Sequence, residues 1–364
     1  MPLPRPTALI NTSSPMTTEM ITNSGSQLAL QSPTEWLWRF FEWFLIDVYG
    51  TAMSLLSEVL GVRMLGYPYM QRAYLAALCI GVIGPLVGTF LVHSRLSMLA
   101  DTLAHTAFAG VAVGLFLNAT LSLSLSPLLT AMVVAVGTAL LVELLIEYAG
   151  AYSDVSLAIV LTGGFALGSV LITATDGGIA VGIDAYLFGS LSTVSKTNVG
   201  LLVGMSLLVG MLVTVAYRPL LYVTVDATAA QAARINVPLY KRLMVVLTAL
   251  VVVSAMQIMG VILVAAMLVV PVAAAALVAT SFKQSILLAI LAAECATIVG
   301  VTAAYTYGIA AGGSIVLIAI GVYATVLATT RLTTTSIVEL LPTKIRRPID
   351  RSDRQLKADG GDEK

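Results

Sequence analysis

The sequence predicts an all-α integral membrane protein, a polytopic bundle of eight to nine transmembrane helices. Of its 364 residues, 58% are hydrophobic and only 10% are charged, and the mean hydropathy of +0.96 lies far above that of soluble globular domains. Uncharged runs recur along the chain, and a run of about 20 residues crosses the hydrocarbon layer as a helix. The runs show no alternation of polar and apolar residues, which excludes a transmembrane β-barrel.

The candidate spans follow the uncharged runs. They cover residues 73–92, 102–117 (uncharged apart from His105), 119–142, 155–175, 197–217, 284–306 and 313–330. Residues 243–282 are also uncharged and form either one long helix or two, with a break expected at residues 257–260 (QIMG). Basic residues favour the cytoplasmic side, which places Arg95, the loop 218–242 and the basic C-terminal tail there. An even number of spans then follows that loop, which favours nine helices over eight.

Three further segments flank the predicted transmembrane domain, residues 67–332. Residues 1–34 are rich in Ser, Thr, Pro and Asn and are expected to be a disordered tail; a start codon assigned too early is the alternative. Residues 35–66 mix aromatic residues with charges, which predicts an amphipathic helix in the membrane interface, with an extra transmembrane helix as the alternative. Residues 333–364 are predicted to be a charged cytoplasmic tail.

Pairs of glycines four residues apart predict helices that approach closely, as in many membrane proteins. The pairs are Gly84 and Gly88, Gly110 and Gly114, and Gly164 and Gly168.

The stretch SMLADTLAHTAFAG places Asp101 and His105 one helical turn apart on the same face. A carboxylate and a neutral imidazole are a good partial shell for a divalent transition metal, and ionisable residues inside a membrane are candidates for function. Two ligands do not complete a site. The alternative is that Asp101 caps the start of the helix and that His105 only packs.

Two other acidic positions and one loop have open interpretations. Glu294 lies deep in a span and either lines a pathway or pairs with a polar residue of a neighbouring helix. Glu143 and Glu147, at the end of a span, are expected to form a solvated face. The alanine-rich residues 226–242 predict a short helix outside the membrane, which docks on a cytoplasmic partner or is a plain connector.

Several classes of function are excluded. No lysine follows a glycine, so the chain has no P-loop, and it contains neither Gly-x-Ser-x-Gly nor His-Glu-x-x-His. The formal net charge is zero, and no basic block suggests nucleic-acid binding. The chain is therefore not expected to be an enzyme, and any ATP that drives it must be hydrolysed by a separate subunit.

Four motifs in order resemble the permeases of metal ABC importers for zinc, manganese and iron(II). Among these, the motifs are most similar to those of the high-affinity zinc uptake permease. They are YMQRAYLAAL (69–78), SRLSMLADTLAHTAFAGVAVG (94–114), AYLFGSLSTVS (185–195) and GVILVAAMLVVPVAAAAL (260–277). The resemblance implies the type II-like ABC importer architecture and a prokaryotic plasma membrane. It also implies a homodimer of the permease, two copies of an ATP-binding subunit and an extracytoplasmic metal-binding protein. It further implies that no cofactor is permanently bound and that Zn²⁺ or Mn²⁺, or else Fe²⁺, is the transported substrate.

The resemblance also implies roles for particular residues. Asp101 and His105 match positions implicated in metal passage, and the loop 226–242 corresponds to the coupling helix that meets the ATPase. The coupling residues are Asp226, Arg234, Asn236, Val237 and Pro238, and the extracytoplasmic gate contains Tyr186, Phe188 and Gly189.

The match has departures. The family's proline after the first aspartate of the coupling loop is Ala227 here, and the glycine expected before Val237 is Asn236, which tolerates a left-handed turn. Glu294 has no recognised counterpart. Two other functions stay open: a proton-coupled secondary transporter that uses Glu294, and a permease for a metal chelate such as cobalamin or a siderophore.

Overall fold

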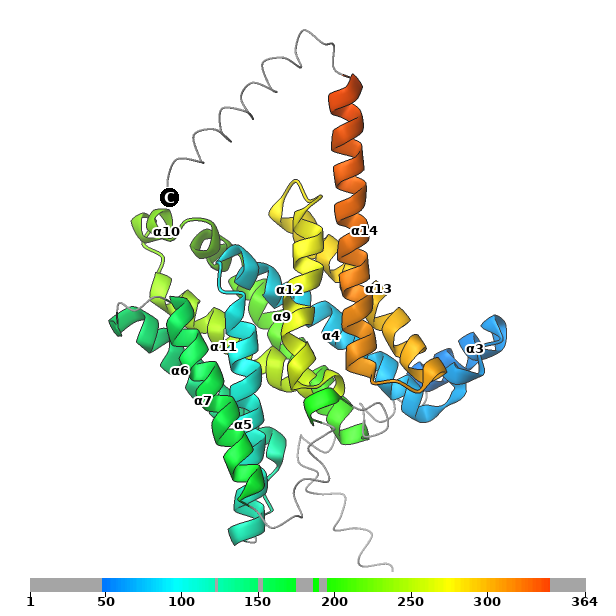
Figure 1. The fold of residues 1–364 in the computed structure, drawn as a ribbon, viewed down its shortest axis with the longest axis horizontal. Helices are drawn as coiled ribbons and strands as arrows, with labels where there is room; N and C mark the ends of the chain where they lie inside the picture. Colours follow the sequence, from blue (N-terminus) through cyan, green and yellow to red (C-terminus); the bar gives the residue numbers. More distant parts are fainter. Residues whose placement is uncertain (1–47, 122–123, 150–152, 175–185, 190–194, 341–364) are drawn as a thin grey trace, which may run out of the picture. The chain divides into compact units, whose positions relative to one another are not determined.

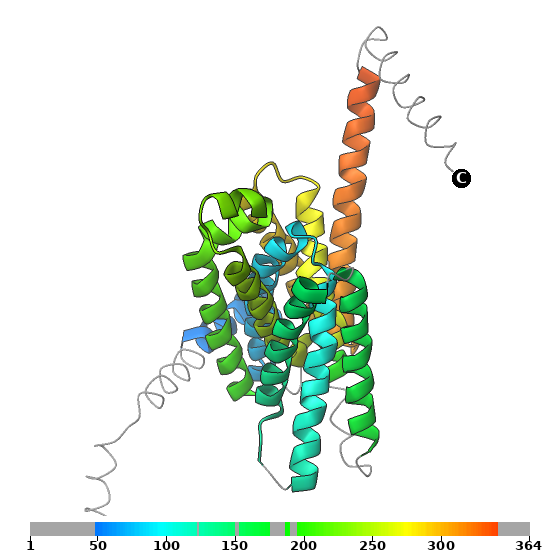
Figure 2. The same ribbon diagram turned by 90° about the vertical axis from the view of Figure 1, so that its left-hand side faces the viewer.

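The computed structural model describes residues 48–121, 124–149, 153–174, 186–189 and 195–340. They belong to two compact units, Met1–Gly66 and Tyr67–Lys364. Within the described ranges every regular element is a helix (Figures 1 and 2), which confirms the predicted all-α class. The predicted tail 1–34 lies outside the described residues.

The first unit contains the helix α3 (Thr51–Leu60) and the 3₁₀ turn η2 (Arg63–Gly66). α3 ends where Gly61 adopts φ +66° and its N–H bonds the carbonyl of Ser57, a left-handed helix end that glycine favours. The predicted continuous helix 35–66 is therefore too long at its C-terminal end, because Gly61 stops it; residues 35–47 are not among those described.

α3 is amphipathic. Leu55, Leu56 and Val59 are 56%, 43% and 83% exposed and occur at the i, i+1, i+4 spacing of one helix face. Ser54, Ser57 and Glu58 supply polar side chains elsewhere on the helix. A short helix with this pattern suits the boundary between lipid and water.

Eight helices of the second unit are long and apolar enough to cross a membrane. They are α4 (Pro68–His93), α5 (Met98–Leu121), α6 (Pro127–Ala149), α7 (Ser153–Thr173), α9 (Lys196–Val225), α11 (Val237–Met259), α13 (Phe282–Tyr307) and α14 (Ala311–Leu340). Every predicted span has a counterpart, but two boundaries differ. The run 119–142 combines the end of α5 with most of α6, which begins at Pro127, a residue suited to a first helical position. α14 continues through residues 333–340, which were predicted to belong to the tail; residues 341–364 are outside the described part.

The uncharged run 243–282 is divided at Gly260. α11 ends at Met259 and α12 (Val261–Ala276) begins directly after it, while Gly260 takes φ +82° and ψ 152°. This backbone region is accessible almost only to glycine, so the break falls where the sequence predicted it. α12 has 16 residues and adds a ninth, shorter apolar helix to the described part of the bundle.

The glycine pairs bring helices into close contact, as predicted. A β-carbon added to Gly110 would lie 2.7 Å from the backbone of α6, and one added to Gly164 would lie 2.7 Å from Thr106 of α5. At Gly88 it would overlap the carbonyl of Leu268 in α12. These contacts let α5 pack against both α6 and α7, and α4 against α12.

Glu143 does not lie on a solvated face. Its carboxylate accepts a 3.1 Å hydrogen bond from Arg242 Nε, and its side chain is only 12% exposed. The sequence-based prediction is wrong for this residue because its cation comes from α11, 99 positions along the chain. The side chain of Glu147 is not described.

Candidate functional site

Asp101 and His105 face each other on the first two turns of α5. The distance from His105 Nε2 to Asp101 Oδ1 is 3.6 Å, and the side chains are 18% and 43% exposed, respectively. Both groups can reach one small ligand while retaining access from outside. The predicted partial metal shell is therefore brought together in the fold.

The start of α5 tests the alternative interpretation of Asp101, that of a helix cap. Arg95 adopts φ +59° and turns the chain between α4 and α5, and the helix then begins at Met98. Asp101 lies in the first turn rather than at the N-cap position, so the capping hypothesis is wrong in its literal form. Its negative charge still interacts favourably with the positive end of the helix.

His105 is held by an aromatic neighbour that the sequence did not single out. The ring of Phe165, on α7, meets the imidazole edge to face, with centroids 5.3 Å apart and planes at 88°. Phe165 also stacks on Phe108 at 5.9 Å. Because Gly164 allows α7 to approach α5, the next residue of α7 reaches the histidine.

The two ring nitrogens of His105 have different surroundings. Nε2 faces Asp101, whereas Nδ1 is buried and has no hydrogen-bond partner among the described residues. A metal that bound Asp101 and His105 together would meet Nε2. Within the described residues no group of three or more His, Cys, Asp or Glu side chains converges.

Two of the three predicted gate residues, Phe188 and Gly189, lie against the break between α11 and α12. Residues 186–188 form a helical turn, and Gly189 follows with φ +73°. A β-carbon on Gly260 would stand 2.6 Å from the carbonyl carbon of Phe188. Burial raises the pKa of the Tyr186 phenol above its ordinary value of 10.0, so this hydroxyl remains protonated at physiological pH.

Gly312, at the start of α14, is a second glycine at this place that sequence reasoning missed. A β-carbon there would overlap the carbonyl of Met259 and stand 2.6 Å from the side chain of Leu263. The break at Gly260 is thus enclosed by the gate segment and by α14.

The loop between α9 and α11 contains the short helix α10 (Ala227–Ala232), as predicted for 226–242, although the C-terminal part of that range already belongs to α11. Asp226 caps α10. Its carboxylate accepts hydrogen bonds from the Thr228 hydroxyl and from the N–H groups of Thr228 and Ala229. These hydrogen bonds hold the pKa of Asp226 below its ordinary value of 3.8, and the one from the Thr228 hydroxyl has the largest effect.

The other predicted coupling residues form the turn from α10 into α11. Arg234 takes φ +62°, whereas Asn236 has φ −75° and accepts a 3.2 Å hydrogen bond from the Leu239 N–H as the N-cap of α11. The left-handed residue is therefore Arg234 and not Asn236. Val237 is buried, and Pro238 is exposed in the first turn. Ala230 is the buried residue of α10, whereas Gln231 and Arg234 are exposed.

Glu294, on α13, packs against α4. A β-carbon on Gly81 would stand 2.6 Å from Glu294 Oε1. Both carboxylate oxygens are buried, and neither has a hydrogen-bond partner among the described residues. The structure therefore shows no pairing of Glu294 with a polar residue of a neighbouring helix among the described residues. An unpartnered carboxylate in the middle of a membrane span costs free energy.

Comparison with known proteins gives a consistent set of relatives. The pattern of the ABC 3 transport family matches residues 66–330. The "Manganese transport system membrane protein MntC" of Halalkalibacterium halodurans is 33% identical over 264 residues, 72% of this chain and 87% of that protein. The "Manganese import system permease protein ScaB" of Streptococcus gordonii is 30% identical over 251 residues, 69% of this chain and 87% of that protein.

A solved structure has the same fold. "PsaBC from Streptococcus pneumoniae in complex with Fab" superposes with a TM-score of 0.66 at 28% sequence identity, over 74% of this chain and 95% of that one. The family match over residues 66–330 includes Asp101, His105 and α10.

Proposed function

Because the chain belongs to the ABC 3 transport family, we propose that it is the membrane-spanning permease of an ATP-driven importer for a divalent transition metal. The observation that carries this proposal is the facing pair Asp101 and His105, 3.6 Å apart on α5. A carboxylate and an imidazole suit Mn²⁺, Zn²⁺ and Fe²⁺ alike. The names of the relatives favour Mn²⁺ as the cargo. The resemblance of the sequence motifs to the zinc uptake permease had favoured Zn²⁺.

The partial site supports a dimeric transporter. One described chain supplies two ligands, and a transition metal ordinarily takes four or more. A second copy of the chain, related by two-fold symmetry, doubles the ligand set to two carboxylates and two imidazoles. Water completes the coordination where the cargo requires six donors.

The energy comes from other subunits. An ATP-binding subunit in two copies docks on the cytoplasmic side, and an extracytoplasmic protein delivers the metal. α10 and the turn containing Arg234, Asn236 and Pro238 form the docking surface for the ATPase. Figure 1 shows α10 and the loop that follows α12 at the same end of the bundle, and both loops are cytoplasmic in the orientation that the basic residues favour.

Transport follows alternating access. The delivered ion enters past Tyr186, Phe188 and Gly189, reaches Asp101 and His105, and leaves toward the cytoplasm when ATP-driven movement of the partner subunits closes the outer side. No cofactor is permanently bound, because the metal is the cargo. The protein resides in a prokaryotic plasma membrane, and α3 lies in its interface, anchored by Leu55, Leu56 and Val59.

A secondary transporter driven by protons through Glu294 is the second candidate, and the buried, unpartnered carboxylate favours it. Purification distinguishes the two functions. An ATP-binding subunit copurifies with an ABC permease and not with a secondary transporter. A permease for a bulky metal chelate, the third possibility, would not depend on Asp101 and His105.

The decisive experiment measures manganese uptake in cells that depend on this system. We expect Asp101→Ala and His105→Ala to abolish uptake while the protein remains in the membrane. His93→Ala is the matched control, because His93 is the only other histidine and lies at the end of α4. Uptake that persists in both site variants would refute the proposed ion-handling role.

A further inference from the structure

The ion pair of Arg242 with Glu143 joins two helices that are far apart in the sequence. Arg242 Nε donates to the Glu143 carboxylate at 3.1 Å, and the side chain of Glu143 is only 12% exposed. The other ion pair that the structure gives between described residues, Asp101 with His105, lies within α5. The pair of Arg242 with Glu143 therefore fixes α11 to α6, at the end of both helices that is cytoplasmic in the proposed orientation.

Arg242 belongs to the helix that continues from the proposed coupling turn. α11 begins at Val237, capped by Asn236, and the helix runs without a break from this start through Arg242. Five residues of helix rise about 7.5 Å, so Arg242 lies about one and a half turns from the cap. A displacement of the turn that contains Arg234 and Asn236 therefore moves Arg242 with it.

Glu143 lies at the depth of the proposed ion-handling pair. α5 and α6 are consecutive spans and run antiparallel, and a β-carbon on Gly110 of α5 would stand 2.9 Å from the β-carbon of Val134 on α6. Asp101 precedes Gly110 by nine residues, and Glu143 follows Val134 by nine residues. Because both helices rise by about 1.5 Å per residue, the turn with Glu143 lies level with the turn that carries Asp101.

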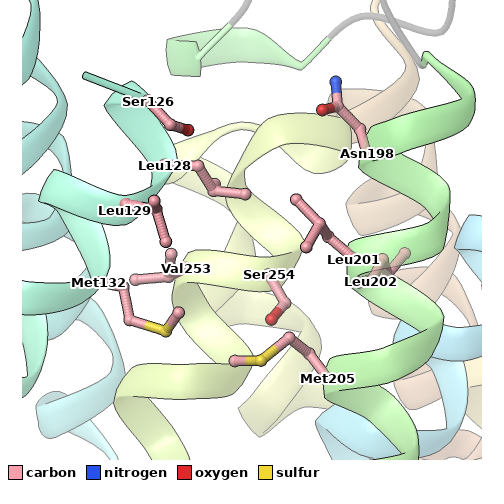
Figure 3. A pocket seen from close by; sticks show the side chains of 10 residues that line it. All are labelled: Ser126, Leu128, Leu129, Met132, Asn198, Leu201, Leu202, Met205, Val253 and Ser254. Atoms are coloured by element: carbon pink, nitrogen blue, oxygen red, sulfur yellow. The ribbon is translucent and has the colours of Figure 1, made fainter. Parts of the chain in front are cut away.

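Toward their other ends α6 and α11 enclose a recess together with α9. Figure 3 shows Met132 of α6, Val253 of α11 and Met205 of α9 around it, and it encloses about 520 Å³, part of it open to the surroundings. Met132 precedes Glu143 by eleven residues, and Val253 follows Arg242 by eleven, so the recess lies about 16 Å along the helices from the ion pair. Side chains that face a void lose contacts there. The polar contact between α6 and α11 is thus at the cytoplasmic end, away from the recess.

We propose that Arg242 and Glu143 are positioning residues for energy coupling, which transmit the movement of the α10 turn through α6 to the Asp101–His105 pair on α5. This inference rests on the proposed transport function. α6 packs along α5, so a shift of Glu143 displaces the helix surface beside Asp101. Without Arg242, a carboxylate that is only 12% exposed loses this cation, and α11 loses its ionic hold on α6.

Stability alone is a weak reason for this ion pair. Arg242 is 49% exposed, and an ion pair with an exposed arginine contributes little to stability, because solvent screens the charges and the long side chain loses freedom. An ionic hydrogen bond does, however, require a defined geometry, whereas apolar burial is non-directional. The pair therefore suits the transmission of a displacement from one helix to another.

The test is a double-mutant cycle in the transporter purified with its ATP-binding subunit and reconstituted into lipid vesicles. The extracytoplasmic metal-binding protein is supplied loaded with Mn²⁺, and manganese uptake and ATP hydrolysis are measured together. We expect Glu143→Gln and Arg242→Gln each to lower the number of Mn²⁺ ions transported per ATP at least about threefold. The double variant should fall no further, because the second substitution acts on a contact that is already lost.

Two further variants control for charge in the same part of α11. Arg242→Lys retains the positive charge and should transport more Mn²⁺ per ATP than Arg242→Gln. Lys241→Gln removes a positive charge from the neighbouring exposed residue and should leave the ratio unchanged. Basal ATP hydrolysis and the amount of copurified ATP-binding subunit should equal those of the wild type in every variant, whereas a merely structural role would lower both.

The remaining outcomes also decide. Additive losses in the double variant, or an unchanged ratio in both single variants, would overturn the proposal. A loss of copurified ATP-binding subunit in Arg242→Gln but not in Glu143→Gln would assign Arg242 to the docking surface and overturn it as well. A wild type that binds no ATP-binding subunit would refute the proposed function, and this inference with it, so the two failures are distinguishable.

Discussion

The Cα of Gly260 lies directly against the peptide that joins Phe188 to Gly189. A β-carbon at Gly260 would stand 2.6 Å from the carbonyl carbon of Phe188 and 2.7 Å from the nitrogen of Gly189. The break between α11 and α12 is thus also the surface on which the proposed gate rests. A side chain at Gly260 would therefore displace one of these two elements.

Gly260→Ala is expected to destabilise the protein and to reduce metal uptake. The backbone at φ +82° and ψ 152° costs a residue with a β-carbon about 1–3 kcal/mol, and the overlap with the gate adds to this. Thermal unfolding of the purified protein and manganese uptake by cells measure the two effects.

Gly137→Ala is the matched control. Gly137 lies within α6, and a β-carbon there would have no neighbour within 4 Å, so alanine should stabilise the helix by up to about 1 kcal/mol. If Gly260→Ala behaved like Gly137→Ala in both measurements, the contact between the gate and the break would have no functional weight.

Glu294→Met should stabilise the fold and lower uptake. The substitution removes two buried oxygens that have no partner among the described residues, a gain of about 1–3 kcal/mol. A carboxylate retained at that cost inside a membrane indicates function, and we expect uptake to fall at least about tenfold. Unchanged uptake would assign Glu294 to packing against Gly81 alone.

Glu143→Met is the control for this substitution, because it makes the same change in a glutamate that has a partner. It removes the carboxylate to which Arg242 donates. The Arg242 side chain is 49% exposed, so solvent screening limits the expected loss of stability to about 0.2–1 kcal/mol. The two glutamates are therefore predicted to change stability in opposite directions.

The features that could be predicted from sequence are local ones. Asp101 and His105 face each other because residues at i and i+4 share a helix face, and this requires no knowledge of the fold. The break at Gly260 could be located because an uncharged run of 40 residues is longer than one span. The run also contains a glycine, whose backbone permits an interruption of the helix. Gly164 and Gly168 likewise predicted that their helix approaches a neighbour closely, but not that this neighbour is α5.

The features that could not be predicted depend on pairs of helices. Phe165 touches His105 from 60 positions away, and a phenylalanine in an apolar helix gives no sign of that contact. The ion pair of Glu143 with Arg242 is likewise set by the packing of α11 against α6. Sequence reasoning assigned the left-handed position to Asn236, the residue type that tolerates it, but the helix end requires it at Arg234.

Asp226→Ala is expected to weaken coupling to the ATPase, because α10 loses its capping carboxylate. Asp226→Asn should retain most of the coupling, since the amide oxygen also accepts hydrogen bonds. Copurification of the ATP-binding subunit and metal-stimulated ATP hydrolysis measure the effect. Ser195→Ala removes the cap of α9 on the opposite side of the membrane and should leave both readouts unchanged.

The pH dependence of this cap follows from the lowered pKa of Asp226. A carboxylate with a lowered pKa gives its full stabilisation above the ordinary value of 3.8 and loses it only as the pH falls through the folded-state value. Coupling should therefore be constant from about pH 5 to about pH 8 with respect to this residue. The assignment of Asp226 as a cap with a lowered pKa would be contradicted if coupling in the wild type fell between about pH 5 and about pH 8 while coupling in Asp226→Asn did not.

Phe165→Ala is expected to weaken the apparent affinity for manganese without abolishing transport. The edge-to-face contact with His105 orients the imidazole, and an aromatic pair contributes about 0.5–1.5 kcal/mol, which corresponds to a two- to tenfold rise in the KM of uptake. The maximal rate should change little, because the ligand groups remain present. Phe165→Tyr keeps the ring and should restore the wild-type KM.

Leu167→Ala controls for the loss of apolar volume on the same helix. Leu167 is 52% exposed and Phe165 is 44% exposed, so both truncations remove a partly exposed side chain from α7. A role in general packing would move the maximal rate and the amount of protein in the membrane similarly for both variants. A role in positioning His105 requires that the KM rise in Phe165→Ala alone, and an equal rise in both variants would refute it.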